Sequence, residues 1–154
     1  MSATTRAPRP GEEDGVDYHF LSEEEFDERA ARGDFVEHAR YSGRRYGTLR
    51  SELDRRLERN HPVVLEIEVQ GARQVRRTMP SAIQVFIAPP SLEALRARLV
   101  GRGTDHPDEV KRRLDVARGE IAAQPEFPYV VVNDRLERAV DELAGIVQRS
   151  LQAA

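Results

Sequence analysis

The second half of the chain alternates short apolar runs with helical stretches, and this alternation limits the possible folds more than any other feature. Three apolar runs have the length and composition of buried strands: residues 63–69, 82–88 and 129–132. Helical stretches, with apolar side chains at every third or fourth position, begin near Ser91, Pro107 and Leu136. Consecutive strands joined by helices form parallel sheets. We therefore predict an α/β fold with a parallel-sheet core, in which ligands bind beyond the carboxyl ends of the strands.

The first part of the chain predicts a smaller mixed segment ahead of this core. Ser22 and Glu25 have capping-box spacing, and Leu21 and Phe26 flank them as a hydrophobic staple, so a helix is expected to begin here. Gly33 can end that helix in the left-handed conformation. The remaining expectations are extended segments at 18–20 and 35–41, a turn at 42–43, and a second helix from Thr48 with Leu49, Leu53 and Leu57 on one face.

Composition excludes several classes of protein. The net charge of −3 does not favour general nucleic-acid binding. No apolar run reaches the length of a membrane span and no signal-peptide pattern opens the chain, so we expect no membrane partner and a cytoplasmic location. The chain has no cysteine, which excludes disulfides and thiolate metal sites, and its histidines lack metal-ligand spacing.

Two arginines in the opening loop, Arg6 and Arg9, have the character of an anion clamp. They are three residues apart in a loop stiffened by prolines, and guanidinium groups match phosphate oxygens well. The alternative is an ordinary charged surface loop.

Carboxylates mark a second candidate site. Glu66 and Glu68 share one face of the predicted strand at 63–69, near its carboxyl end, where a buried carboxylate is costly unless it is paired or hydrogen-bonded. Glu37, in the extended run 35–41, could accept two hydrogen bonds from the edge of a base. A plain exposed glutamate is the alternative at position 37.

A glycine-flanked break at residues 101–104 separates two predicted helices and carries Arg102, with Arg98 and Arg113 on either side. An arginine in such a hinge can close over a substrate as part of a lid. Arg113 lies off the apolar stripe of its helix, so simple solvation is the alternative for that residue.

Several of these segments together resemble guanylate kinase, and the resemblance covers nearly the whole chain in order and spacing. The segments are SATTRAPRPG (2–11), DYHF (17–20), YGT (46–48), LEIEVQG (65–71), FIAPP (86–90), GRGT (101–104) and VND (132–134). The resemblance implies a P-loop-type parallel-sheet core, an inserted GMP-binding subdomain at 2–60 and a helical lid at 91–119. The core itself would comprise residues 61–90 and 120–154.

The resemblance also implies roles for individual residues. Arg6, Arg9, Tyr18 and Tyr46 would hold the GMP phosphate, with Glu66 in the polar network nearby. The guanine would be surrounded by Ser2, Glu37, Thr48 and Glu68. Arg102 and Arg113, helped by Arg98, would clamp the transferring phosphoryl group, and Asn133 would lie toward the adenine of ATP. Mg²⁺ is expected to accompany ATP, and the protein is expected to be a monomer or a homodimer.

Two departures from the family pattern stand out. Glu68 occupies a position where the family usually has the shorter Asp. The 154 residues also contain no Gly-x-x-x-x-Gly-Lys-Ser/Thr motif, the P-loop with which the family begins, and Lys111, the only lysine, lies within a predicted helix. Three hypotheses follow: an active guanylate kinase with a misassigned start, an inactive fragment, or a GMP- or phosphopeptide-binding module without catalysis.

Overall fold

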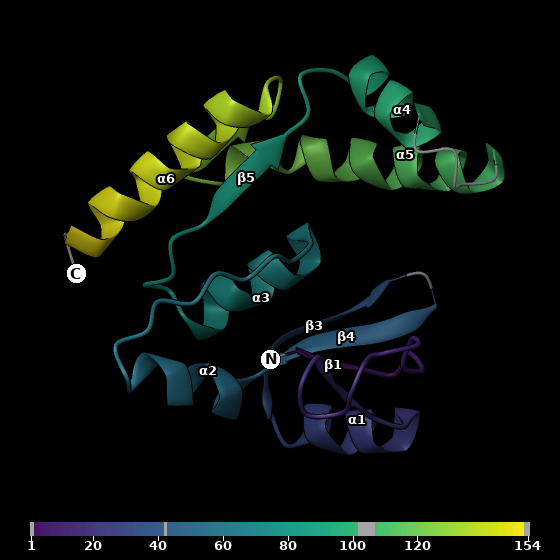
Figure 1. Cartoon of the computed structure of the whole chain (residues 1–154), viewed down its shortest axis with the longest axis vertical. Coiled ribbons are helices and arrows are strands. Elements are labelled where there is room, and N and C mark those ends of the chain that lie inside the picture. The colour runs from purple at the N-terminus through teal and green to yellow at the C-terminus, as the bar shows by residue number, and fades with distance from the viewer. Residues whose placement is uncertain (1, 42, 102–106, 153–154) are drawn as a thin grey trace. The chain divides into compact units, whose positions relative to one another are not determined.

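A computed structural model describes residues 2–41, 43–101 and 107–152. The chain divides into two compact units, one extending to Ala82 and the other beginning at Ile83 (Figure 1). The first unit holds a mixed sheet with three helices, and the second holds a small parallel sheet with the remaining helices. This is the predicted α/β class of fold.

A four-stranded sheet with strand order β2-β1-β4-β3 forms the centre of the first unit. Its strands are β1 (Ser2–Thr4), β2 (Tyr18–Phe20), β3 (Phe35–Tyr41) and β4 (Arg44–Leu49). β1 pairs parallel to β2 and antiparallel to β4, and β3 pairs antiparallel to β4. The register of the last pair brings Glu37 opposite Thr48, just after an irregularity in β3. The predicted extended runs at 18–20 and 35–41 are confirmed.

Helix α1 (Glu23–Ala31) covers one part of this sheet and begins as predicted. The Ser22 side chain accepts from the Glu25 amide, and the Glu25 side chain accepts from the Ser22 amide, which completes the capping box. Gly33 follows the helix with a φ of 76°. Phe26 and Leu21 both contribute to a core with Phe35, where the Phe26 and Phe35 rings stack with their centroids 4.4 Å apart.

Helices α2 (Arg50–Leu57) and α3 (Val69–Thr78) enclose a second core, built around Val36, Leu53 and Val75. The prediction that Leu49, Leu53 and Leu57 form one apolar face of this helix is only partly correct. Leu49 is buried but precedes the helix as its N-terminal cap residue, and Leu57 is exposed.

The strand predicted at residues 63–69 is wrong. Residues 61–68 form no strand, and Val69 begins helix α3. The alternation that suggested a strand is real, because Val63, Leu65 and Ile67 pack on the second core while Val64 is 83% exposed. Alternation specifies which side chains are buried, whereas a strand also needs a neighbour to complete its hydrogen bonds. No strand of the described residues pairs with this segment.

The second unit contains a two-stranded parallel sheet of β5 (Val85–Ala88) and β6 (Tyr129–Val132). Its helices are α4 (Leu92–Gly101), α5 (Pro107–Ala122), a short 3₁₀ turn (Gln124–Glu126) and α6 (Leu136–Gln152). The Ser91 hydroxyl accepts from the Ala94 amide at 3.1 Å and so caps α4 as predicted. β5 begins three residues later than the sequence pattern suggested, and β6 is buried fully only at Val131.

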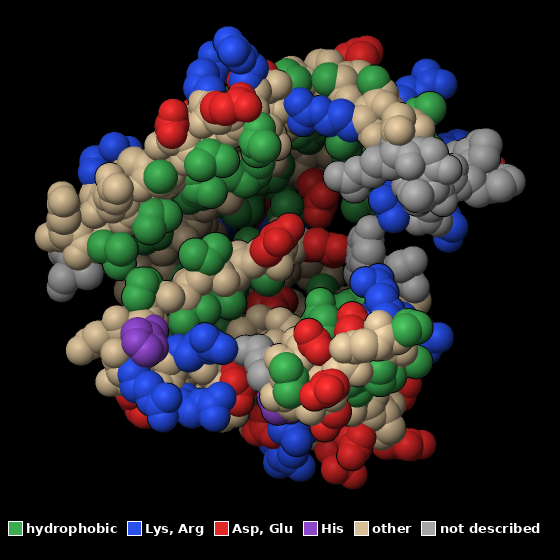
Figure 2. Space-filling view, viewed as in Figure 1, with side chains coloured by type: hydrophobic (Ala, Val, Ile, Leu, Met, Phe, Trp, Pro, Cys, Tyr) green, Lys and Arg blue, Asp and Glu red, His purple; other side chains and the backbone are tan. Residues whose placement is uncertain are grey.

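Helix α6 exposes most of the face that was predicted to be buried. Leu136 is 65% exposed and Leu151 55%, whereas Ala139 and Ile146 are buried against Val131. Hydrophobic side chains are visible along this helix in Figure 2. A sheet of two strands covers only a narrow strip of a helix, so the rest of the apolar face remains open. No helix among the described residues is both long and apolar enough to cross a bilayer.

Candidate functional site

The first unit contains a cavity of about 490 Å³ that brings together most of the residues predicted to bind a ligand. Its size is typical of a small-molecule site. Strands β1, β3 and β4 form one side, and the extended segment before α3 forms another. The predicted residues that line it are Ser2, Tyr18, Glu37, Tyr46, Thr48, Glu66 and Glu68.

Glu37 provides a buried carboxylate in this cavity. Its residue exposure is only 5%, and the Thr48 hydroxyl on the neighbouring strand donates to Glu37 Oε1 at 2.7 Å. Burial raises the pKa of Glu37, and the hydrogen bond from Thr48 opposes this shift in part. A carboxylate held in this way can accept further hydrogen bonds through its other oxygen. The alternative of a plain exposed glutamate is therefore excluded.

Glu66 and Glu68 line the same cavity although they are not on a strand. Glu68 is the residue immediately before α3, in extended conformation, so the start of that helix determines its place. The predicted strand that was to place both carboxylates on one face is absent, but both residues line one cavity all the same.

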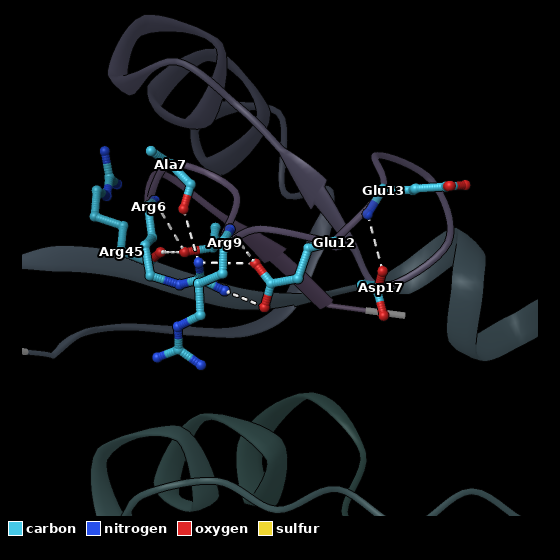
Figure 3. Close-up of polar contacts among 8 residues, drawn as sticks. Arg6, Ala7, Arg9, Glu12, Glu13, Asp17 and Arg45 are labelled. Carbon is cyan, nitrogen blue, oxygen red and sulfur yellow. Dashed lines mark hydrogen bonds and ion pairs between the residues drawn. The ribbon is translucent and has the colours of Figure 1, made fainter.

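Arg6 lies beside this cavity in the loop that follows β1. Its guanidinium carbon lies 5.4 Å from the centre of the Tyr18 ring. Glu12 accepts two hydrogen bonds from Arg6, at 2.9 and 3.0 Å, and is the main cause of the raised pKa of Arg6, to which Tyr46 adds. Figure 3 shows this paired arrangement. Arg6 thus presents a cation whose orientation is set by a carboxylate.

Sequence reasoning missed Glu12. Its carboxylate also accepts from the Arg9 amide at 2.7 Å, and the hydrogen bond from Arg6 lowers the pKa of Glu12. The available signal was its position, three residues after Arg9 in the same loop, but a loop carboxylate has no periodicity that distinguishes it from a solvated one. The Arg9 side chain is exposed and does not line the cavity.

Two buried threonines attach the arginine loop to β4. Thr4 donates to the Arg45 carbonyl at 2.9 Å and accepts from the Arg6 amide at 3.1 Å. The Thr5 hydroxyl accepts from the Arg45 amide at 3.1 Å. These hydrogen bonds hold the backbone next to Arg6 against β4.

In the second unit, Arg98 of α4 donates to the backbone carbonyl of Asn133 at 2.8 Å. Two residues predicted for different parts of the site, the lid and the adenine side, are therefore in direct contact. Arg113 is half-buried on α5. Arg102 lies outside the described residues.

The fold and the cavity define an α/β protein with a polar ligand site that carries a buried carboxylate and a paired arginine. The family model for guanylate kinase matches residues 1–150. A guanylate kinase of Streptomyces coelicolor is 51% identical over 146 residues, which cover 95% of this chain and 74% of that protein. A guanylate kinase of Frankia casuarinae is 52% identical over 147 residues, covering 96% and 80% of the two chains.

A solved structure gives the same result. The crystal structure of guanylate kinase from Anaplasma phagocytophilum superimposes with a TM-score of 0.76 at 34% identity, covering 97% of this chain and 73% of that one. The chain therefore belongs to the guanylate kinase family. It spans about three-quarters of the length of these relatives.

Proposed function

We propose that this protein is a guanylate kinase, which transfers a phosphoryl group from ATP to GMP to give ADP and GDP. The observation that carries the proposal is the buried Glu37 carboxylate, which faces a cavity of nucleotide size and has one oxygen already bonded to Thr48. Guanine presents two adjacent hydrogen-bond donors on one edge, and adenine does not. A buried acceptor left unpaired by the wrong base discriminates strongly between substrates.

The base would be read by Glu37 together with Ser2, Thr48 and Glu68. All four residues line the cavity. The acceptors and hydroxyls among them suit a base edge rich in donors.

The GMP phosphate would be held by Arg6, Arg9, Tyr18 and Tyr46, with Glu66 in the same polar network. The pairing of Arg6 with Glu12 supports this role, because a guanidinium that is already oriented loses less freedom when it binds an anion. Arg9 extends from the same loop as an exposed cation that a phosphate can engage.

Direct phosphoryl transfer needs positioning and charge neutralisation rather than a covalent nucleophile. In the second unit, Arg98, Arg102 and Arg113 would neutralise the transferring group, and Asn133 would lie toward the adenine. Mg²⁺ would enter with ATP as part of the substrate. We assign residues 2–60 to GMP binding, 61–90 and 120–154 to the core and 91–119 to the lid, in a cytoplasmic monomer or homodimer.

Calorimetric titration of the chain with GMP and AMP tests this proposal. We expect GMP to bind and AMP to bind far more weakly. Arg6→Ala should weaken GMP binding by about tenfold to a hundredfold, the loss expected for charge-assisted hydrogen bonds. Arg59→Ala, at an exposed position outside the cavity, is the matched control and should bind GMP normally. Tight phosphopeptide binding without GMP binding would replace this proposal with that of a binding module.

A further inference from the structure

Helix α3 is attached to the free edge of β3 by side chains. The Gln74 amide donates to the His38 carbonyl at 2.7 Å, and its oxygen accepts from the His38 amide at 3.1 Å. The Thr78 hydroxyl, one helical turn later, donates to the Val36 carbonyl at 3.1 Å. The helix thereby holds the main chain on both sides of Glu37.

The same face of α3 meets the Glu37 side chain at Gly71. A Cβ atom at position 71 would lie 2.6 Å from Glu37 Oε2 and 3.3 Å from its Cδ. The carboxylate is thus confined on two sides, with Oε1 bonded to Thr48 and Oε2 against the bare backbone of the first turn of α3. Only a glycine permits this approach.

We propose that Gly71 and Gln74 are positioning residues that fix the rotation of the Glu37 carboxylate and so set the selectivity for a base with two adjacent donors. The proposal rests on the proposed function of Glu37 as the reader of guanine. Gln74 fixes the backbone that carries the carboxylate, and Gly71 leaves the space in which Oε2 lies. Neither residue lines the cavity.

The carboxylate can respond to a methyl group at position 71 by rotating, because the terminal torsion of glutamate is broad and soft. Rotation should affect the stability of the fold little, and alanine is the better residue within a helix. The strength of a hydrogen bond, however, falls steeply with misalignment. Gly71→Ala should therefore preserve the fold and impair recognition.

The experiment compares GMP with IMP, whose base keeps the ring donor but lacks the exocyclic amine. Affinities of both ligands and the melting temperature are measured on the full chain. For Gly71→Ala we expect GMP binding to weaken by about tenfold or more, as for the loss of one charge-assisted hydrogen bond. IMP binding should change less, so the ratio of the two affinities should fall, while the melting temperature stays at or above that of the wild type.

Gly145→Ala is the matched control, because Gly145 is also helical, lies outside the lid, and its Cβ would meet only the flexible end of the Arg149 side chain, at 3.3 Å. It should change neither affinity. Gln74→Leu removes both bonds to His38 and should also lower the GMP-to-IMP ratio. Thr78→Val removes the bond to the Val36 carbonyl, on the other side of Glu37, and should lower the ratio too.

The outcomes are distinguishable. If the wild-type chain bound GMP and IMP equally, the proposed function of Glu37 would fail. If the wild type discriminated and Gly71→Ala kept the same ratio, the positioning role of Gly71 would be overturned alone. Should Gly71→Ala fail to fold, a GMP-to-IMP ratio in Gln74→Leu equal to that of the wild type would overturn the proposal.

Discussion

Replacing Glu37 by glutamine changes the charge of the proposed base-reading group and almost nothing of its shape. The amide oxygen of glutamine can still accept from the Thr48 hydroxyl, as Oε1 does now at 2.7 Å. The amide nitrogen then occupies the place of Oε2. A hydrogen-bond acceptor facing the base thus becomes a donor.

The size of the effect on binding follows from this exchange. One charge-assisted hydrogen bond is lost, worth about 1.5–3 kcal/mol, and two donors face each other, leaving at least one buried donor unsatisfied at a cost of about 1–3 kcal/mol. The sum, about 2.5–6 kcal/mol, corresponds to a dissociation constant for GMP that is roughly 10²–10⁴-fold higher. Discrimination between GMP and AMP should shrink accordingly.

Although Glu37→Gln should weaken GMP binding, it should leave the fold as stable as the wild type or make it more stable. At neutral pH the wild type keeps a carboxylate at a position that is only 5% exposed, where burial raises the pKa of Glu37. A neutral amide avoids the desolvation of that charge. The free energy of unfolding of Glu37→Gln at pH 7 is therefore expected to equal or exceed that of the wild type.

Titration calorimetry with GMP and AMP, together with urea unfolding followed by circular dichroism, measures both effects. The reasoning would be refuted if the dissociation constant for GMP rose by less than about threefold, a change of under 1 kcal/mol. A large loss of stability would also refute it, because it would mean that the charge stabilises the fold rather than serving the ligand.

Four further predictions concern pH, core packing and helix capping. Guanosine, which has no phosphate to titrate, should bind less tightly as the pH falls through the raised pKa of Glu37, and Glu37→Gln should lose this dependence in calorimetry across an acidic pH series. The raised pKa of Glu37 also makes stability depend on pH: its contribution to stability is greatest below the usual pKa of glutamate and is lost as the pH rises through the raised value. The wild type and Glu37→Gln should therefore have similar unfolding free energies at acid pH. Phe26→Ala removes a fully buried ring stacked on Phe35 and in contact with the Arg45 guanidinium, and urea unfolding should give a loss of about 3–5 kcal/mol. Ser22→Ala breaks the capping box of α1 and should lower the unfolding free energy by about 1 kcal/mol without changing GMP affinity.

Local signals predicted the beginning and the end of helix α1 well. The cap at Ser22 and the end of α1 near Gly33 depend on interactions within a few residues, which the sequence contains in full. The residues lining the cavity were likewise identified by motifs that carry their own spacing.

Features that depend on distant partners could not be predicted in the same way. Residues 63–68 alternate like a strand, but strand formation depends on a neighbouring edge, and alternation does not report whether one is available. The width of the sheet that packs against α6 determines how much of the helix is buried. The sequence pattern therefore overestimated the burial of the face that carries Leu136. The sequence did not predict the role of Gly71, because that role depends on its close approach to Glu37, which only the folded structure defines.

The bonds from Gln74 and Thr78 to β3 also bear on how the protein behaves at high concentration. The edge of a sheet is a template on which another extended chain can add, and proteins commonly block it with charge, proline or a covering element. Here the side-chain amide of Gln74 satisfies the same donor and acceptor of His38 that an added strand would use, and Thr78 occupies the carbonyl of Val36. Helix α3 therefore blocks this part of the sheet edge, at Val36 and His38, against self-association, and it does so through uncharged side chains.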